Sequence, residues 1–417
     1  MNKESIFKKS GNAIQIPGSK SLTQRALVAA ALAQGNSFIS NALVSEDTLY
    51  LMNGLRALGA QIVSIKGGFL ISGMAGKLLN SGKEIFLGNN GTALRIMVAL
   101  VTLGCGKYVL TGEKRLCERP VGTLVDALQS MNVDISCRDN CPPVTVNAAG
   151  LRGGNIILKN IESSQYVSAL LLCAPYTEKG INLSLQGAIV SAPYIDLTIS
   201  VMRDFGAKVI ETNPHEYFVE AGKIYDGINY FIEGDASSAS YFFEAAAILK
   251  RPVKVYGIGT GSRQGDIKLL KIMEQLGCKI NSGHNWIEMA CSNLREGDFI
   301  FDLNDMPDMV PTLAVIAAFR QGKTVITNVA HLRIKESNRL GALTSELKRT
   351  GIAVSETADG LIIQGGNPQP AQIETYNDHR IAMSFAIAGL AVPGIEITNK
   401  KCVDKSFPGF WEELKKI

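Results

Sequence analysis

Helix-like stretches of small apolar residues recur along this chain at a nearly constant interval. Each stretch opens on polar residues and continues into a run rich in Ala, Leu and Val, and the six runs begin near Ser21, Thr92, Ser164, Ser237, Asp308 and His379. By subtraction, the steps between these positions are 71, 72, 73, 71 and 71 residues. A period this regular over a whole chain predicts six repeated structural units.

A second helical pattern follows each of these stretches at the same rhythm. Its six copies read LRALGAQI, VDALQSMNVDI, ISVMRDFGAKVI, LKIMEQLGCKI, TSELKRTGIAV and FWEELKKI. In several copies a glycine ends the helix, and an apolar stretch typical of a buried strand follows it. Each unit is therefore expected to hold two helices interleaved with strands, which places the chain in the α/β class.

The 417 residues exceed what one compact core usually holds, so we expect two domains of three units each. The break is predicted near 231–235, giving a first domain over 18–233 and a second domain over 1–17 plus 234–417. The first strand, over 13–16, precedes the first repeat helix, so we expect it to join the last unit and close the second domain. Two such crossings predict a hinge near Pro17 and Gly234.

Composition excludes several classes of protein. A net charge of +4 is small for this length, and no aromatic-basic pattern indicates nucleic acid. No apolar run approaches the roughly 18 residues that span a bilayer, and no apolar signal core follows the first residues. The eight cysteines are scattered; only Cys137 and Cys141 lie close together, without a second pair or a nearby His. We therefore expect a cytoplasmic protein with reduced thiols and without metal or cofactor.

The openings of the first helices point to anion binding. Ser, Thr, Asp and Asn alone are explained about half the time by helix capping. Lys20, Arg25 and Arg380 are not, because a helix N-terminus disfavours a cation unless an anion lies nearby. The residues therefore favour a site for negatively charged ligands at these helix starts.

Eleven motifs, in order along nearly the whole chain, resemble those of the 5-enolpyruvylshikimate-3-phosphate synthases. They are PGSKSLTQRAL, LGNNGTALR, ERPVGTLVDAL, SSQYVSALL, PYIDLT, EGDASSASYF, QGDI, NDMPD, RIKESNRL, YNDHRIAM and KSFPGF. The resemblance implies the two-domain enolpyruvyl-transferase fold, with six βαβαββ-type units and pseudo-threefold symmetry. It also implies a monomeric transferase of chorismate and aromatic amino acid biosynthesis, which moves the enolpyruvyl group of phosphoenolpyruvate to the 5-hydroxyl of shikimate 3-phosphate and releases phosphate.

The same resemblance implies the binding residues. Those expected to hold shikimate 3-phosphate are Lys20, Ser21, Arg25, Ser163, Ser164, Gln165, Tyr194, Asp308 and Lys335. Those expected to hold phosphoenolpyruvate are Lys20, Gly91, Arg119, Gln165, Arg339, Arg380 and Lys405. This inventory suits two substrates that carry phosphate and carboxylate groups, since the planar Arg fork matches both. Gly91 is expected to approach phosphoenolpyruvate through its backbone, so that a side chain there would clash.

The implied reaction needs a base for the hydroxyl and an acid for the methylene carbon. Asp308 is the candidate base, and Glu336 and Lys20 are candidates for proton exchange at carbon, with His379 assisting. On its own, Asp308 would be interpreted as a helix cap, and Glu336 as half of a surface ion pair. The surrounding motifs favour the catalytic interpretation of both.

Three positions depart from the family pattern. Asn90 precedes Gly91 where a small residue such as Ala is usual, which bears on the shape of the phosphoenolpyruvate pocket and on the response to glyphosate. Asn338 replaces an Asp beside Arg339, which would leave that guanidinium freer or more weakly oriented. His331 stands where some members have Asn, and it keeps a donor.

Three other classes of protein fit the sequence less well. The sister transferase that uses UDP-N-acetylglucosamine carries a reactive cysteine five residues before the Arg of its RP pair, where this chain has Lys114; Cys117 is out of register. A P-loop is excluded because GSKS lacks the required GxxxxGK[ST]. A binding scaffold would repeat its surface residues from unit to unit, whereas the polar residues here differ in each unit.

Overall fold

The computed structural model of this chain describes residues 13–80 and 82–417. It divides into two compact units. We call Ser19–Ile232 the N-terminal unit, and Glu233–Ile417 together with the chain up to Gly18 the C-terminal unit. Each has its own hydrophobic core. That these units are domains with the predicted bounds, and that they move about a hinge, stays a prediction.

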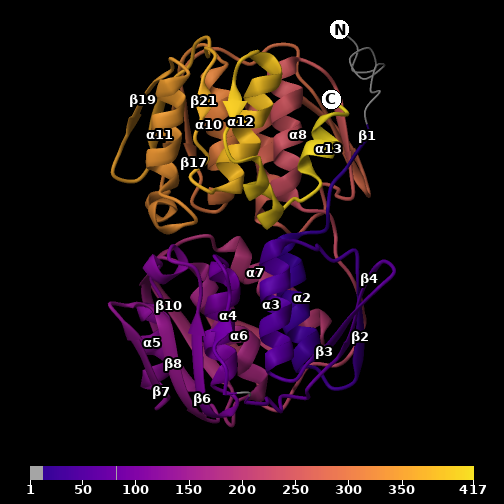
Figure 1. Cartoon of the computed structure of the whole chain (residues 1–417), viewed down its shortest axis with the longest axis vertical. Coiled ribbons are helices and arrows are strands. Elements are labelled where there is room, and N and C mark those ends of the chain that lie inside the picture. The colour runs from indigo at the N-terminus through magenta and orange to yellow at the C-terminus, as the bar shows by residue number, and fades with distance from the viewer. Residues whose placement is uncertain (1–12, 81) are drawn as a thin grey trace. The chain divides into compact units, whose positions relative to one another are not determined.

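The six predicted small-residue helices are all present (Figure 1). They are α2 (Lys20–Leu32), α4 (Gly91–Val101), α6 (Ser164–Cys173), α8 (Ala236–Leu249), α10 (Val310–Ala318) and α12 (His379–Ala391). A 3₁₀ turn, η4 (Pro307–Met309), precedes α10 and carries Asp308. Nearly every residue of these helices is buried, because small side chains let neighbours pack around the whole helix. In the C-terminal unit α8, α10 and α12 pack against one another.

The second helix of each unit is also present. These helices are α3 (Glu46–Ala57), α5 (Gly122–Ser130), α7 (Pro193–Asp204), α9 (Leu269–Gln275), α11 (Arg339–Arg349) and α13 (Phe410–Leu414). Gly59, Gly206 and Gly277 follow α3, α7 and α9 with φ of 108°, 93° and 96°. A residue with a Cβ would be strained at such angles, so glycine ends the helix there.

Five sheets among the described residues have four strands and one connection pattern. The N-terminal unit holds β13 (Asn229–Phe231), β2 (Asn36–Ser40), β4 (Gly68–Ser72) and β3 (Gln61–Ile65); β5 (Ile85–Phe86), β6 (Cys105–Thr111), β8 (Cys141–Ala149) and β7 (Asp134–Arg138); and β9 (Gly154–Ile161), β10 (Ile181–Ile189), β12 (Glu216–Val219) and β11 (Val209–Asn213). The C-terminal unit holds β1 (Ala13–Gln15), β14 (Val253–Tyr256), β16 (Trp286–Ala290) and β15 (Lys279–Gly283); and β17 (Phe299–Asp302), β18 (Lys323–Thr327), β20 (Leu361–Gln364) and β19 (Ala353–Glu356).

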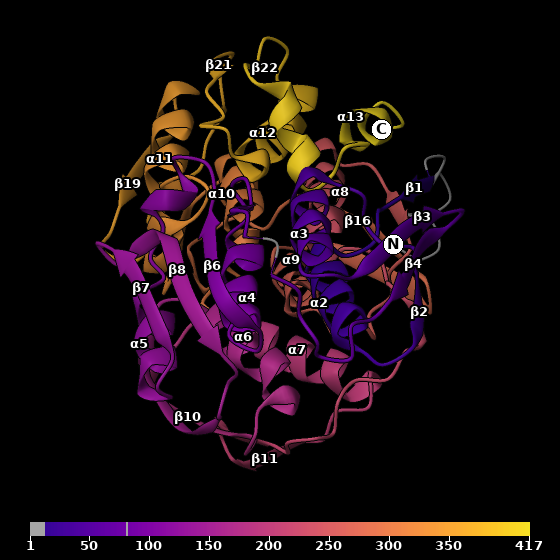
Figure 2. The ribbon, with the colours of Figure 1, turned by 60° about the horizontal axis from the view of Figure 1, so that its bottom comes forward.

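In each of these sheets one strand pairs parallel to the next, and the other two pairings are antiparallel. The parallel pair needs a crossover helix, and the small-residue helix is that crossover in the units where the chain is continuous. Figure 2 shows β2, β3 and β4 beside α2 and α3, all of the first of the six repeats. The sixth unit is shorter: only β21 (Gln372–Ile373) and β22 (Glu396–Ile397) pair there.

The prediction that the first strand joins the last unit is wrong. β1 pairs parallel with β14 of the fourth unit, as Ile14 faces Val255. The strand just before α8, β13, pairs instead with β2 of the first unit. Because β13 pairs with β2, it is not available to pair with β14, and β1 takes that place. Each of the two strands thus completes the sheet in which the other would be expected. Within the C-terminal unit, Gly18 and Gly234 form an antiparallel bridge.

Candidate functional site

Most candidate residues of the N-terminal unit lie in the first turns of α2, α4 and α6, while Arg119 follows a 3₁₀ turn over Leu116–Glu118 and Tyr194 lies in the first turn of α7. Ser19 caps α2, and Lys20 is its first residue. The Lys20 ammonium lies 3.0 Å from a carboxylate oxygen of Asp47, the second residue of α3, which is buried. A cation at a helix N-terminus opposes the helix dipole, and the Asp47 carboxylate offsets that cost.

Arg25 is buried, and all its hydrogen-bond acceptors in this unit are neutral. Its Nε donates to Thr198 Oγ1 at 2.7 Å, and Nη1 donates to the Ser21 carbonyl at 3.0 Å. Nη2 donates to Ser168 Oγ and to the Tyr194 carbonyl, both at 3.2 Å. Burial lowers the pKa of Arg25 to about 10, with a small opposing effect from Tyr194, so the guanidinium is still charged at neutral pH. Within residues 13–80 and 82–417 of this chain, its hydrogen-bond acceptors include no carboxylate, so it is a fixed positive charge.

A second buried arginine, Arg95, joins α4 to α6. Its Nη1 donates to the Gly91 carbonyl at 3.2 Å and to Gln165 Oε1 at 2.8 Å, and Nη2 donates to the Pro120 carbonyl at 2.7 Å. The Gln165 amide nitrogen donates to Thr92 Oγ1 at 3.0 Å. The predicted residue Gln165 is therefore held by α4 through both ends of its amide.

The other predicted residues of this unit lie close by. Ser163 caps α6 and accepts from the Gln165 N–H at 3.3 Å, and Ser164 is the buried first residue of that helix. Gly91 is packed against two guanidinium groups: a methyl group placed on it would come within 2.5 Å of Arg119 Nη2 and 2.6 Å of Arg95 Nη1. A side chain at position 91 would therefore require the guanidinium groups of Arg119 and Arg95 to shift.

In the C-terminal unit, three carboxylates surround the guanidinium of Arg339. Its Nη1 lies 2.9 Å from Asp308, its Nη2 lies 2.8 Å from Glu336, and its Nε lies 2.8 Å from Asp378. The Arg339 side chain is 1% exposed and that of Asp378 is 0% exposed. These carboxylates outweigh the burial that would otherwise lower the pKa of Arg339, and they raise it above the ordinary value.

Arg380 shares Asp308 with Arg339. Its Nη2 lies 2.6 Å from the second carboxylate oxygen of Asp308, and its backbone N–H donates to Asp378 at 3.0 Å. Burial would raise the pKa of Asp308, yet Arg380, Arg339 and Lys335 outweigh it and hold that pKa well below the ordinary value. Asp308 is thus firmly ionised while both guanidinium groups face it.

A further carboxyl group, that of Asp266, is linked to Arg380 through Ser237. Ser237 Oγ donates to Asp266, and Arg380 Nη2 reaches Ser237 Oγ at 3.5 Å. Burial, and after it the nearby Asp308, raises the pKa of Asp266 to about 7. This acid can therefore change its charge near neutral pH.

The remaining predicted residues belong to the same unit. His379 begins α12 beside Asp378, with its Nδ1 3.8 Å from Asp378 Oδ1, and both side chains are buried. Lys405 is buried in a 3₁₀ segment, η6 (Lys400–Lys405). Asn338 caps α11, since its Oδ1 accepts from the Gly341 N–H at 3.3 Å, so the cap survives the replacement of Asp. Burial, followed by Lys335, lowers the pKa of His331 to about 3, so His331 is neutral.

The sequence interpretation missed four charged residues: Asp47, Arg95, Asp266 and Asp378. Three of them lie inside the quoted motifs LGNNGTALR, QGDI and YNDHRIAM, next to residues that were selected. Arg95 follows Gly91 by four residues, which places both on one face of α4. That spacing is a signal that could have identified Arg95; nothing local marks Asp47.

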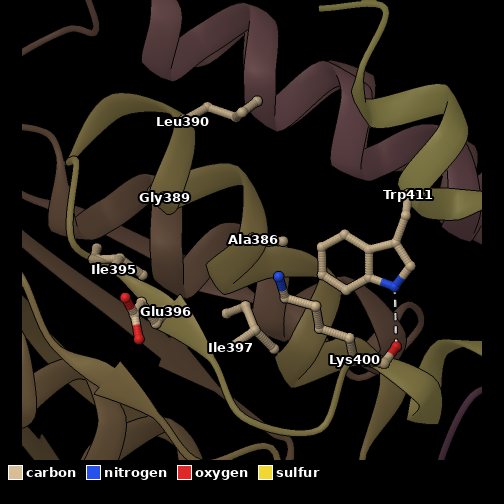
Figure 3. A pocket seen from close by; sticks show the side chains of 8 residues that line it. All are labelled: Ala386, Gly389, Leu390, Ile395, Glu396, Ile397, Lys400 and Trp411. Carbon is tan, nitrogen blue, oxygen red and sulfur yellow. Dashed lines mark hydrogen bonds between the residues drawn. The ribbon is translucent and has the colours of Figure 1, made fainter.

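A surface cavity lies at the opposite end of α12 from Arg380. Its volume is about 480 Å³, and Figure 3 shows its lining residues, Ala386, Gly389, Leu390, Ile395, Glu396, Ile397, Lys400 and Trp411. The Trp411 indole N–H donates to the Lys400 carbonyl at 3.0 Å. None of the predicted site residues lines this cavity, so it is separate from the charged cluster.

Two further searches cover the described residues, 13–80 and 82–417. They contain no group of three or more His, Cys, Asp and Glu side chains that could hold a metal ion. No helix among them is long and apolar enough to cross a membrane. All eight cysteines fall in this part of the chain and are free thiols.

Comparison with known proteins identifies the family. The family model described as EPSP synthase (3-phosphoshikimate 1-carboxyvinyltransferase) matches residues 7–414. A 3-phosphoshikimate 1-carboxyvinyltransferase of Trichormus variabilis is 41% identical over 408 residues, which cover 97% of this chain and 96% of that protein. The enzyme of the same name from Marinomonas sp. is 40% identical over 415 residues, covering 98% and 97%.

Solved structures agree with these matches. An EPSP synthase from Acinetobacter baumannii superposes with a TM-score of 0.79 at 28% identity, covering 98% of this chain and 96% of that one. The chain therefore belongs to the EPSP synthase family of enolpyruvyl transferases. The predicted family and its two-domain enolpyruvyl-transferase fold are confirmed.

Proposed function

We propose that this chain transfers the enolpyruvyl group of phosphoenolpyruvate to the 5-hydroxyl of shikimate 3-phosphate and releases phosphate. The observation that carries this proposal is the full-length match to 3-phosphoshikimate 1-carboxyvinyltransferases. The same match favours this reaction over transfer to UDP-N-acetylglucosamine. The reaction belongs to chorismate and aromatic amino acid biosynthesis.

In the addition step, the hydroxyl oxygen bonds to C2 of phosphoenolpyruvate, loses its proton to a base, and a second proton adds to the methylene C3. In the elimination step, the bond between C2 and the phosphate oxygen breaks. Loss of a proton from the new methyl group then restores the double bond. Both steps need positioned acid and base groups and donors for anionic oxygens.

Asp308 is our candidate base for the hydroxyl, and its two arginines explain how its basicity could change. With Arg339 and Arg380 at 2.9 and 2.6 Å, its carboxylate is a poor base. Phosphoenolpyruvate bound to Arg339, Arg380 and Lys405 would divert part of that positive charge to its own anionic groups. The pKa of Asp308 would rise as a result, and the base would become active when substrate is present.

Glu336 and Lys20 are our candidates for proton exchange at carbon, with His379 assisting. Glu336 lies 2.8 Å from Arg339, and Lys20 lies 3.0 Å from Asp47. The shikimate 3-phosphate group is proposed to bind the residues around Arg25, whose neutral partners leave its charge available, together with Ser21, Ser163, Ser164, Gln165 and Tyr194, and with Asp308 and Lys335. Phosphoenolpyruvate is also proposed to contact Lys20, Gly91, Arg119 and Gln165.

We also propose that the enzyme acts as a monomer in the cytoplasm, without nucleic acid, membrane or metal. Its free thiols suit a reducing compartment. Light scattering of the purified protein measures its oligomeric state, and a dimer would contradict the proposal.

The test of the function is phosphate release from phosphoenolpyruvate by purified protein in the absence of added metal. We expect release with shikimate 3-phosphate and none with UDP-N-acetylglucosamine as acceptor. Release with the sugar nucleotide alone would overturn the assigned acceptor. If no phosphate is released with either acceptor, the proposed activity is wrong.

A further inference from the structure

The side chain of Asn90 makes three hydrogen bonds that join three helices. Its Oδ1 accepts from the Ala93 N–H at 2.9 Å and so caps α4. Its Nδ2 donates one hydrogen to Gln24 Oε1 in α2 at 3.1 Å and the other to the Asp47 carbonyl in α3 at 2.8 Å. Asn90 is 1% exposed, so water does not compete with these bonds.

The residues that Asn90 holds lead to Lys20. Gln24 is one helical turn after Lys20 and is itself buried. Asp47 carries the carboxylate that binds the Lys20 ammonium at 3.0 Å. Asp47 therefore contacts both residues: its main-chain carbonyl accepts from Asn90, and its side-chain carboxylate binds Lys20.

The next residue in the chain after Asn90 is Gly91, which is closely surrounded by other side chains. A single methyl group on Gly91 would come within 2.5 Å of the Arg119 guanidinium. Arg95 Nη1 also donates to the Gly91 carbonyl at 3.2 Å, so the position of the first turn of α4 bears directly on both guanidinium groups. The polar side chain at position 90 does not fill this space, because all its polar atoms are turned to α2, α3 and the α4 backbone.

We propose that Asn90 is a positioning residue for the phosphoenolpyruvate-binding groups of the N-terminal unit. By tying the first turn of α4 to α2 and α3, it sets the spacing of Gly91, Arg119 and Lys20. This inference rests on the function proposed above. A role in capping alone would require only the Oδ1 acceptor, whereas positioning requires the two Nδ2 donors as well.

Two substitutions separate these roles. Asn90→Ser and Asn90→Asp each keep an oxygen that can cap α4, and each removes the two Nδ2 donors to Gln24 and Asp47; Asn90→Ser, which adds no charge, is the deciding variant of the two. We expect the KM for phosphoenolpyruvate to rise by about tenfold or more, as expected when binding groups are displaced. The KM for shikimate 3-phosphate should rise clearly less than the KM for phosphoenolpyruvate, because Arg25 is held by other residues and, of Gly91, Arg119 and Lys20, only Lys20 belongs to both proposed binding sets.

Gln24→Ala provides a second, independent variant, because it removes one acceptor of the tie and leaves the cap intact. We expect it to raise the KM for phosphoenolpyruvate in the same direction. The double variant Gln24→Ala/Asn90→Ser should raise that KM by less than the product of the two single effects, because both remove the same bond. If the Asn90 variants do not fold, as judged by circular dichroism, the KM values of Gln24→Ala decide the matter.

A normal KM for phosphoenolpyruvate in the folded Asn90 variants would overturn the inference and leave Asn90 as a cap. Equal rises in both KM values would do the same, since they would indicate a general loosening. Wild-type protein is assayed in parallel. If it releases no phosphate with shikimate 3-phosphate, the proposed function itself fails, and that outcome is distinct from the failure of the Asn90 variants to differ from wild type.

Discussion

The two units differ in the partners of the buried arginines of the candidate site. In the N-terminal unit, Arg25 and Arg95 donate only to hydroxyl, amide and main-chain oxygens in the contacts described above. In the C-terminal unit, Arg339 faces three carboxylates, and Arg380 faces one of the same three. The hydroxyl and amide partners leave the positive charge to an anionic ligand, while two of the carboxylate partners, Asp308 and Glu336, are themselves candidates for proton transfer.

We propose that this difference reflects a division of labour. In this proposal the N-terminal unit mainly binds phosphate, and the C-terminal unit adds groups whose protonation can change. Lys20 is the exception, since it has an acidic partner in the N-terminal unit. It is also the residue of that unit that the family resemblance links to proton exchange at carbon.

The strongest test of this division is Asp308→Ala. We expect the protein to fold and to lose turnover by roughly two to four orders of magnitude, as the removal of a positioned acid or base usually does. Steady-state kcat measures the effect, and Asp308→Asn, which keeps the shape, should lose nearly as much. A kcat close to wild type would remove Asp308 from the mechanism.

The next largest expected difference is in the free energy of unfolding of Arg339→Ala and Arg25→Ala. Arg339→Ala leaves Asp378 buried without its main cation, and we expect a loss of roughly 3–5 kcal/mol in the free energy of unfolding. Arg25→Ala leaves the hydroxyls of Ser168 and Thr198, which already lie 2.7 Å apart and can bond to each other. Its cost should be nearer to about 1–3 kcal/mol. Urea unfolding of the two variants compares them, and equal losses would break the contrast.

Arg25→Ala should also act on substrate binding. We expect the KM for shikimate 3-phosphate to rise about 10- to 100-fold with a much smaller change in kcat, because a phosphate clamp is used equally in the ground and transition states. Arg25→Lys keeps the charge but not the fork, so its effect should be intermediate. An unchanged KM in Arg25→Ala would mean that this arginine only braces α2 and α7.

The smallest expected effect concerns Asp266. Its pKa is raised from 3.8 to about 7 by burial and by Asp308. The folded protein therefore keeps a proton that the unfolded chain loses, so stability falls as pH rises from about 4 to about 7. We expect this fall to be roughly 1–2 kcal/mol, less than the full shift implies because Asp308 is coupled to it.

Asp266→Asn should abolish that part of the pH dependence, because an amide does not titrate in this range. Thermal unfolding measured at several pH values between about 4 and 8 provides the comparison. Asp308 does not confuse the result, because its lowered pKa gives a stabilising contribution that is present throughout this range and is lost only below about pH 4. An unchanged pH profile in Asp266→Asn would mean that Asp266 is ionised throughout.

Much of the fold was predictable from local features. The repeat of 71–73 residues is present as six pairs of helices, because runs of Ala, Leu and Val and the glycines that end helices act within a few residues. The motifs also identified the family, which the comparisons confirm. Which strand completes which sheet was not predictable, since the exchange of β1 and β13 depends on pairings between segments about 190 to 240 residues apart.

The sequence by itself determined the repeated units and the residue types suited to anionic substrates. Only the tertiary structure decided which partners those residues have. Arg339 bonds to Asp378 across 39 positions, Arg25 bonds to Thr198 across 173, and Asn90 bonds to Gln24 across 66. Helix formation depends on neighbours in sequence, whereas the charge state of a buried group depends on whatever the packed fold places beside it.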